Sequence, residues 1–196
     1  MSTNKKYGDF VLYKKFEREL TKGNFDNLIP YLSGSSQQAK DYAIEWAAYY
    51  GKLDCLITIV NKGGDIHILN DVALQMSALN GHTDVVNYLL QNNSNINTTN
   101  GAPLMNAIEN GHLDVVNILL DHVNETGQKS CDIHIIYESP LRTAIEKGFY
   151  DITKKLIEAG ADIHINDDLP LNLAIRLGQS DIVKLLIENG AKQMDK

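Results

Sequence analysis

A glycine with an aspartate three positions later recurs along this chain at nearly constant spacing. Five of these copies begin at Gly51, Gly81, Gly111, Gly148 and Gly178, so these successive glycines are 30, 30, 37 and 30 residues apart. A fixed period in this range is typical of stacked structural repeats, in which each unit buries its apolar face against its neighbours. Because a linear stack presents an extended surface and not an enclosed pocket, the period predicts a binding scaffold.

Each period contains the pattern of two short helices. In residues 103–123, Pro103 suits a first helical position because its φ is already fixed, and Leu104, Ala107 and Ile108 follow at helical spacing. The turn glycine then ends this helix in a left-handed conformation. Asp114 falls in the first turn of the next helix, where the helix dipole favours an anion.

The same pattern recurs in residues 41–60, 71–90, 139–157 and 169–187. Short Asp/Asn-Ile-His/Asn segments at residues 65–68, 95–98, 132–135 and 162–165 join one helix pair to the next, and we expect these segments to be extended.

This arrangement, Pro-Leu-x-x-Ala before Gly-His-x-Asp-Val-Val and Leu-Leu before Gly-Ala, resembles the ankyrin repeat. The resemblance implies an all-α ankyrin-repeat solenoid of about six stacked helix-turn-helix units, forming one domain over residues 1–196. Residues 7–36 are interpreted as a degenerate N-terminal capping unit, because a terminal unit has only one neighbour. Five repeats follow, at residues 39–68, 69–98, 99–134, 135–164 and 165–192.

Two departures from the ankyrin pattern are informative. Most units are 30 residues long, against about 33 in the family, which predicts shortened hairpin fingers and shifts the expected contacts toward the first helices. Units this short resemble the ankyrin proteins of giant amoebal viruses, with a bacterial effector as the alternative. The second departure is an insertion of seven residues within residues 121–130. A functional loop on a rigid scaffold and a tolerated insertion without a role both remain open.

Composition narrows the class of partner. The net charge is −7, with +3 on residues 1–22 and −10 on the remainder. This balance argues against nucleic acid as a partner and favours a protein partner with a basic surface. We expect a cytoplasmic monomer without a membrane contact, because the sequence has no leading apolar segment and no apolar run long enough to span a membrane.

No catalytic motif for nucleotide binding, metalloprotease or serine hydrolase chemistry occurs in the sequence. We therefore predict a non-enzyme with no catalytic, cofactor or metal site. Cys55 takes a position that is aliphatic in the other units and is interpreted as a core residue. The aspartates that begin each second helix are interpreted as helix-capping groups.

Three histidines, His67, His134 and His164, occupy one repeat position, two residues after an aspartate. Packed helices lie about 8–10 Å apart, too far for neighbouring units to share a zinc ion with ligands about 2 Å away. We predict instead that these histidines bond the linker backbone, with Asn97 as a substitute, and that His82 and His112 bond backbone at the turns.

The resemblance implies that the concave groove is lined by the residues just before each turn glycine. These positions differ from unit to unit, which is expected of a recognition surface. With the neighbouring tryptophan, the predicted partner-binding residues are Trp46, Tyr49, Tyr50, Leu79, Asn80, Glu109, Asn110, Glu146, Lys147, Arg176 and Leu177.

Aromatic residues concentrate in the first full unit, where Tyr42, Trp46, Tyr49 and Tyr50 share one helix face. Tyrosine and tryptophan are enriched at binding hot spots. We expect Trp46 and Tyr42 to fill the core beside the irregular first unit, and Tyr49 and Tyr50 to be exposed.

Three functional hypotheses follow. The leading one is a non-enzymatic adaptor that holds one protein partner in its groove. The others are a self-associating virion or assembly component, and a substrate-receptor subunit of a ubiquitin ligase.

Overall fold

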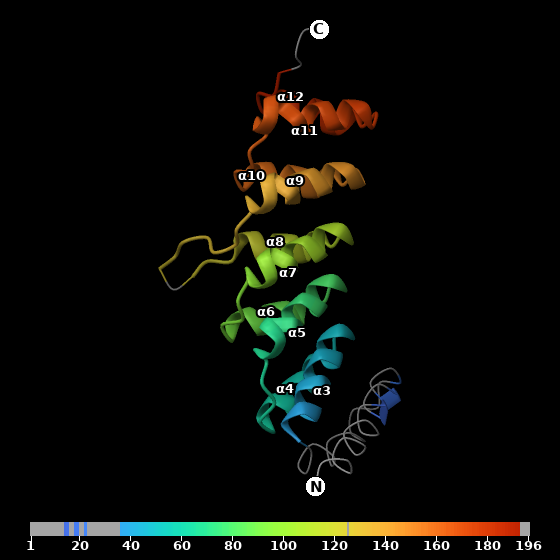
Figure 1. Cartoon of the computed structure of the whole chain (residues 1–196), viewed down its shortest axis with the longest axis vertical. Coiled ribbons are helices and arrows are strands. Elements are labelled where there is room, and N and C mark those ends of the chain that lie inside the picture. The colour runs from blue at the N-terminus through green and yellow to red at the C-terminus, as the bar shows by residue number, and fades with distance from the viewer. Residues whose placement is uncertain (1–13, 16–17, 20–21, 23–35, 125, 193–196) are drawn as a thin grey trace.

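Five helix pairs stack in chain order along one axis in the computed structural model (Figure 1). The structure describes residues 14–15, 18–19, 22, 36–124 and 126–192. The predicted capping unit, residues 7–36, therefore lies almost wholly outside the described residues.

In each pair a first helix of 12 or 13 residues precedes a second helix of nine residues. The first helices are α3 (Gln37–Tyr49), α5 (Ile68–Leu79), α7 (Thr98–Glu109), α9 (Ile135–Lys147) and α11 (Ile165–Arg176). The second helices are α4 (Leu53–Asn61), α6 (Thr83–Gln91), α8 (Leu113–Asp121), α10 (Tyr150–Glu158) and α12 (Ser180–Glu188). The prediction of an all-α solenoid is confirmed.

The core is a continuous aliphatic stripe through all five pairs. First helices contribute Leu74, Leu104 and Ile108, and second helices contribute Leu89 and Leu119, all fully buried. Cys55 is buried within this stripe, as predicted. Successive helix pairs pack against one another along this stripe. Each pair therefore depends on the next for its apolar burial.

Two of the turn glycines, Gly51 and Gly81, have two reasons to lack a side chain. Gly51 has φ +64°, which disfavours any residue with a Cβ. In addition, a Cβ at Gly51 would come within 2.4 Å of the His82 ring of the next unit. A Cβ at Gly81 would meet His112 in the same way, so the next unit packs directly against the glycine.

The linkers turn where the sequence predicted extended segments. His67 has φ −92° and ψ 4°, and Asn97 has φ −99° and ψ 14°. In three of the first helices, the three residues after the first one have positive φ. They are Leu69–Asp71 in α5, Thr99–Gly101 in α7 and Asn166–Asp168 in α11. The expectation of extended joins was wrong, because a short left-handed turn redirects the chain where longer units have a finger.

The aspartates of the second helices lie in the first turn and not at the N-cap position. Asp54 and Asp114 are first-turn residues, preceded by the N-cap residues Lys52 and His112. The position favoured by the helix dipole is therefore confirmed. Asp84 also accepts the first-turn N–H of Val85 at 2.9 Å, as the capping interpretation expects.

Candidate functional site

The first helices contact one another more extensively than the second helices do. The row of first helices therefore forms the tighter, inner side of the stack, on which the predicted partner-binding residues lie. At the ends of these helices Tyr49, Glu109, Asn110, Glu146, Lys147, Arg176 and Leu177 are exposed, whereas Trp46, Tyr50, Leu79 and Asn80 are half-buried.

Two of the amides in this row serve the helices that carry them. The side-chain amides of Asn80 and Asn110 donate to the carbonyls of Met76 and Asn106, each at 2.9 Å. Each of these carbonyls also accepts the backbone N–H of the same asparagine, at 3.3 Å, so both amides reinforce the end of the helix that carries them. The remaining members of the row supply the variation in chemistry from unit to unit.

Three aromatic rings gather at the end of α3. Trp46 and Tyr50 stack with their centroids 5.4 Å apart, and Tyr49 lies edge-on to Tyr50 at 5.0 Å. Trp46 and Tyr50 also pack against the core. The expectations were therefore right for Trp46 and Tyr49 and wrong for the other two, since Tyr42 is exposed and Tyr50 is half-buried.

Sequence reasoning missed Glu45, which lies between Tyr42 and Tyr49 on α3. Its side chain is half-buried, and this burial raises the pKa of its carboxyl group above the ordinary value. The sequence carried one sign of this site, an acid inside an aromatic stripe at helical spacing.

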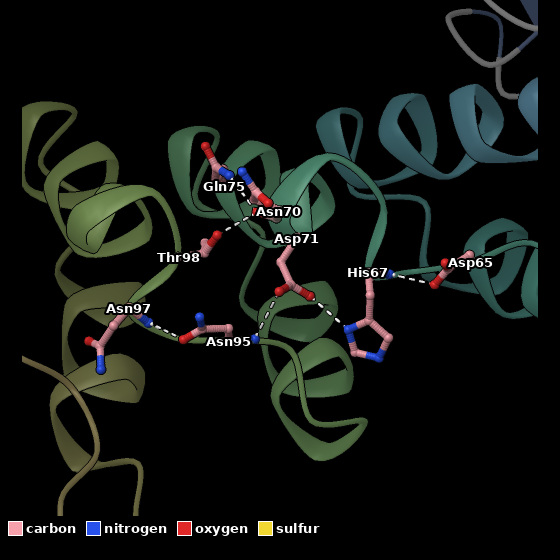
Figure 2. A network of polar contacts seen from close by, with 8 residues as sticks. All are labelled: Asp65, His67, Asn70, Asp71, Gln75, Asn95, Asn97 and Thr98. Carbon is pink, nitrogen blue, oxygen red and sulfur yellow. Dashed lines mark hydrogen bonds and ion pairs between the residues drawn. The ribbon is translucent and has the colours of Figure 1, made fainter.

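A carboxylate near the start of each of three first helices accepts the backbone N–H of the linker 24 residues later. Asp41 accepts from Asp65 at 3.4 Å, and Asp71 accepts from Asn95 at 3.1 Å (Figure 2). Asp168 accepts in the same way from Lys192 at 3.1 Å. We call this bond the linker clasp; it ties the first helix of a unit to the segment that follows the second helix of the same unit.

The predicted histidine–backbone bonds take a different form. His67 Nδ1 contacts the Asp71 carboxylate at 2.8 Å, as Figure 2 shows, and His164 contacts Asp168 at 2.6 Å. The prediction for these histidines was wrong, because each side chain contacts the carboxylate of a clasp and not the linker backbone. Among the residues that the structure describes, no three histidine, cysteine or acidic side chains are grouped to hold a metal ion.

Asn97 takes over where the clasp carboxylate is missing. Gly101 occupies the position of Asp71 in the next unit, and the Asn97 side chain accepts the N–H of Asp132 at 2.8 Å. Asn97 also donates to the Ser130 carbonyl at 2.7 Å. The prediction that Asn97 bonds backbone is confirmed.

The turn histidines bond backbone of the preceding unit. His82 Nε2 lies 2.9 Å from the Tyr49 carbonyl, and His112 Nε2 lies 2.9 Å from the Leu79 carbonyl. Both bonds hold the C-terminal end of a first helix, where the predicted groove residues lie. The prediction that these histidines bond backbone at the turns is therefore confirmed, across unit boundaries.

The insertion forms a hairpin that projects sideways from the stack between α8 and α9 (Figure 1). Val123 and Lys129 form an antiparallel bridge, and the Asn124 side chain accepts from the amides of Thr126 and Gln128. Lys155 of the next unit contacts Asp121 at 2.8 Å. The described part of the hairpin is thus held at its base by both neighbouring units.

Neither cysteine resembles an activated nucleophile. Burial raises the pKa of Cys55 and of Cys131 to about 12, whereas reactive cysteines have lowered pKa values. Within the described residues, no helix combines the length and the apolar character needed to cross a membrane.

A stack of helix pairs with a varied row on its inner face defines a class of repeat proteins that act through their surfaces. The family model for ankyrin repeats (3 copies) matches residues 44–135 and 125–196. This chain belongs to the ankyrin-repeat family, whose repeats are generally protein–protein interaction modules and typically not enzymes. A comparison with curated proteins found no match.

Proposed function

We propose that this chain is a non-enzymatic adaptor that binds one protein partner along the row of first-helix ends. One observation supports this most: the exposed residues of the row change chemistry from unit to unit. Tyr49, Glu109, Glu146 and Arg176 occupy the same position in four units, whereas the buried positions behind them stay aliphatic or alanine. A constant frame with a varied exposed row is suited to recognition of one particular surface.

The partner is expected to present basic groups, because the chain carries a net charge of −7. The resemblance of the short units to ankyrin proteins of giant amoebal viruses motivates a host protein as this partner, met in the host cytoplasm. In this proposal the chain acts as a monomer.

A matched pair of variants tests the proposal. The groove variant combines Tyr49→Ser with Arg176→Ser, and the control combines Tyr150→Ser with Lys154→Ser on a second helix. Tyr49 and Tyr150 are similarly exposed, at 38% and 41%. We would tag wild type and both variants, capture partners from cell lysate, and identify them by mass spectrometry.

Loss of a partner only in the groove variant supports the proposal, provided that both variants unfold at the same temperature as wild type. Retention in both variants contradicts it and directs attention to the hairpin at residues 122–130. Loss in the control alone also contradicts it, since the second helices would then carry the partner.

Self-association is the second candidate, and one observation favours it. Ile175 is 38% exposed and Ile187 is 50% exposed, although the equivalent Ile145 and Leu120 are buried by a following unit. Exposed aliphatic side chains at the end of a stack offer a surface to a second copy. Molecular mass that rises with protein concentration, and that Ile187→Glu abolishes, would favour this candidate over the monomeric adaptor.

A further inference from the structure

The aromatic face of α3 contains a carboxylate. Tyr42 lies three residues before Glu45 and Tyr49 lies four residues after it, and these spacings place side chains next to one another on one helix face. Trp46 follows Glu45 directly and stacks with Tyr50. Glu45 is therefore an acid on the most aromatic surface of the row, whereas Asp41, one turn earlier, already accepts from Gln37 and Asp65.

The Glu45 carboxylate lacks a polar partner in the described part of the chain. No described residue donates a hydrogen bond to it or forms an ion pair with it. Burial raises the pKa of the group, and no described cation acts in the opposite direction. A half-buried carboxylate without a partner is costly, because it has lost water without gaining a donor.

The repeat itself does not require an acid at this position. The equivalent residues in the next three units are Gln75, Met105 and Arg142. Gln75 bonds the Thr99 hydroxyl at 3.1 Å, and Arg142 lies 3.9 Å from Glu146. The first contact joins two units and the second lies within α9. Glu45 makes neither kind of contact among the described residues, which favours a role toward a ligand.

An arginine side chain matches this surface best. Its guanidinium is planar and pairs with a carboxylate through two parallel hydrogen bonds while it stacks on aromatic rings. A cation above an aromatic ring is also attracted by the negative face of the ring. A metal ion fits poorly, because among the described residues no three histidine, cysteine or acidic side chains are grouped to hold one, and metals such as calcium take six or more oxygen ligands.

We propose that Glu45, with the aromatic side chains around it, binds an arginine side chain of the protein partner. The inference rests on the proposed function, since it assigns one subsite of the same row of first helices. It also places the expected basic group of the partner at α3, the N-terminal end of that row.

The probe is an acetylated and amidated tripeptide, Gly-Arg-Gly, compared with its citrulline and lysine twins. Citrulline has nearly the shape of arginine without the charge. Because Trp46 is the only tryptophan, its indole N–H gives a single assigned NMR signal beside the site. We expect the arginine peptide to bind about tenfold more tightly than the citrulline peptide, with the lysine peptide between them.

The variants are Glu45→Gln and, as a matched control, Glu158→Gln at the end of α10, outside the row. We expect Glu45→Gln to weaken the arginine peptide about tenfold and Glu158→Gln to leave its binding unchanged. Glu45→Gln should not lower the unfolding temperature, because the charged form is the one that burial disfavours. A structural role for the carboxylate would lower it.

Equal binding of the arginine and citrulline peptides would overturn the proposal, as would unchanged binding to Glu45→Gln. Lysine binding as tight as arginine would overturn the assignment of a guanidinium. The proposed function fails separately: a partner that survives both Tyr49→Ser/Arg176→Ser and Glu45→Gln refutes the groove. A partner lost in the former and retained in the latter refutes only the arginine subsite.

Discussion

Replacing Glu138 with aspartate tests whether the linker clasp stabilises the stack. At Asp41, Asp71 and Asp168 a carboxylate oxygen accepts the N–H of the residue 24 positions later, at 3.1–3.4 Å. The equivalent oxygen of Glu138, Oε2, is buried and has no hydrogen-bond partner among the described residues. Glutamate is one methylene longer than aspartate, and we infer that this extra length keeps its carboxylate from the N–H of Asp162, the residue 24 positions later.

The magnitude follows from three contributions. A buried polar atom without a partner costs about 1–3 kcal/mol, which Glu138→Asp would recover. Glu138 also has φ +57°, and aspartate tolerates this left-handed conformation better than glutamate does. Loss of one buried methylene costs about 0.8 kcal/mol. The sum favours the variant by about 1 kcal/mol.

Thermal unfolding followed by circular dichroism measures this gain. A stabilisation of about 1 kcal/mol corresponds to a rise of about 2–4 °C in the unfolding temperature of a chain of this size. Hydrogen exchange adds a local measurement, because the amide of Asp162 should exchange more slowly once it is bonded. The matched control, Asp71→Glu, should lower stability and speed exchange at Asn95.

If Glu138→Asp leaves both the unfolding temperature and the exchange rate of the Asp162 amide unchanged, the linker clasp does not stabilise the stack. A rise in unfolding temperature without slower exchange at Asp162 would assign the gain to the backbone conformation and not to the clasp.

Two further predictions concern a turn and a surface ion pair. Gly51→Ala should lower the free energy of unfolding by about 1 kcal/mol more than Gly178→Ala does, as measured by chemical denaturation. Both glycines have positive φ, but only at Gly51 would a Cβ displace His82. Equal losses in the two variants would contradict the packing argument. Asp121→Asn should lower stability by no more than about 0.5 kcal/mol, and added salt should abolish the difference. The hydrogen bond from Lys155 lowers the pKa of Asp121, so this contribution is present above the unfolded-state pKa and is lost as the pH falls through the folded-state pKa; a difference that persists in strong acid would refute it.

The repeat period and the apolar pattern were sufficient to predict the helices and the core. Leu104, Ala107 and Ile108 are fully buried, as their spacing indicated. Helical periodicity succeeds here because each unit imposes the same pattern again, and five consistent copies exclude a chance match.

The linkers were harder to predict, because their conformation depends on neighbouring units. Leu69 has φ +47° and is 68% exposed, although nothing in the sequence marks a leucine for that conformation. Only the Asn70-Asp71 pair that follows hinted at it, since both residue types tolerate left-handed backbone. Similarly, the contact of His67 with Asp71 requires the left-handed turn between them, so an extended linker predicted the wrong partner.

The candidate site was predicted in place but not in detail. Positions before each turn glycine were expected to face the groove, and that assignment stays a prediction. Glu45 was missed because it lies one turn earlier in α3, and its missing partner becomes visible only with the surrounding structure.

The linker clasp also bears on how such a chain changes length in evolution. Donor and acceptor are 24 residues apart and lie within one unit of 30 residues, so duplication or loss of a whole unit leaves every remaining clasp matched. The seven inserted residues lie in the unit that has Gly101 in place of the clasp carboxylate. In that unit no described carboxylate joins the first helix to the linker across the insertion. Relatives of this chain are therefore expected to differ by whole units, with smaller insertions confined to units that lack the acid.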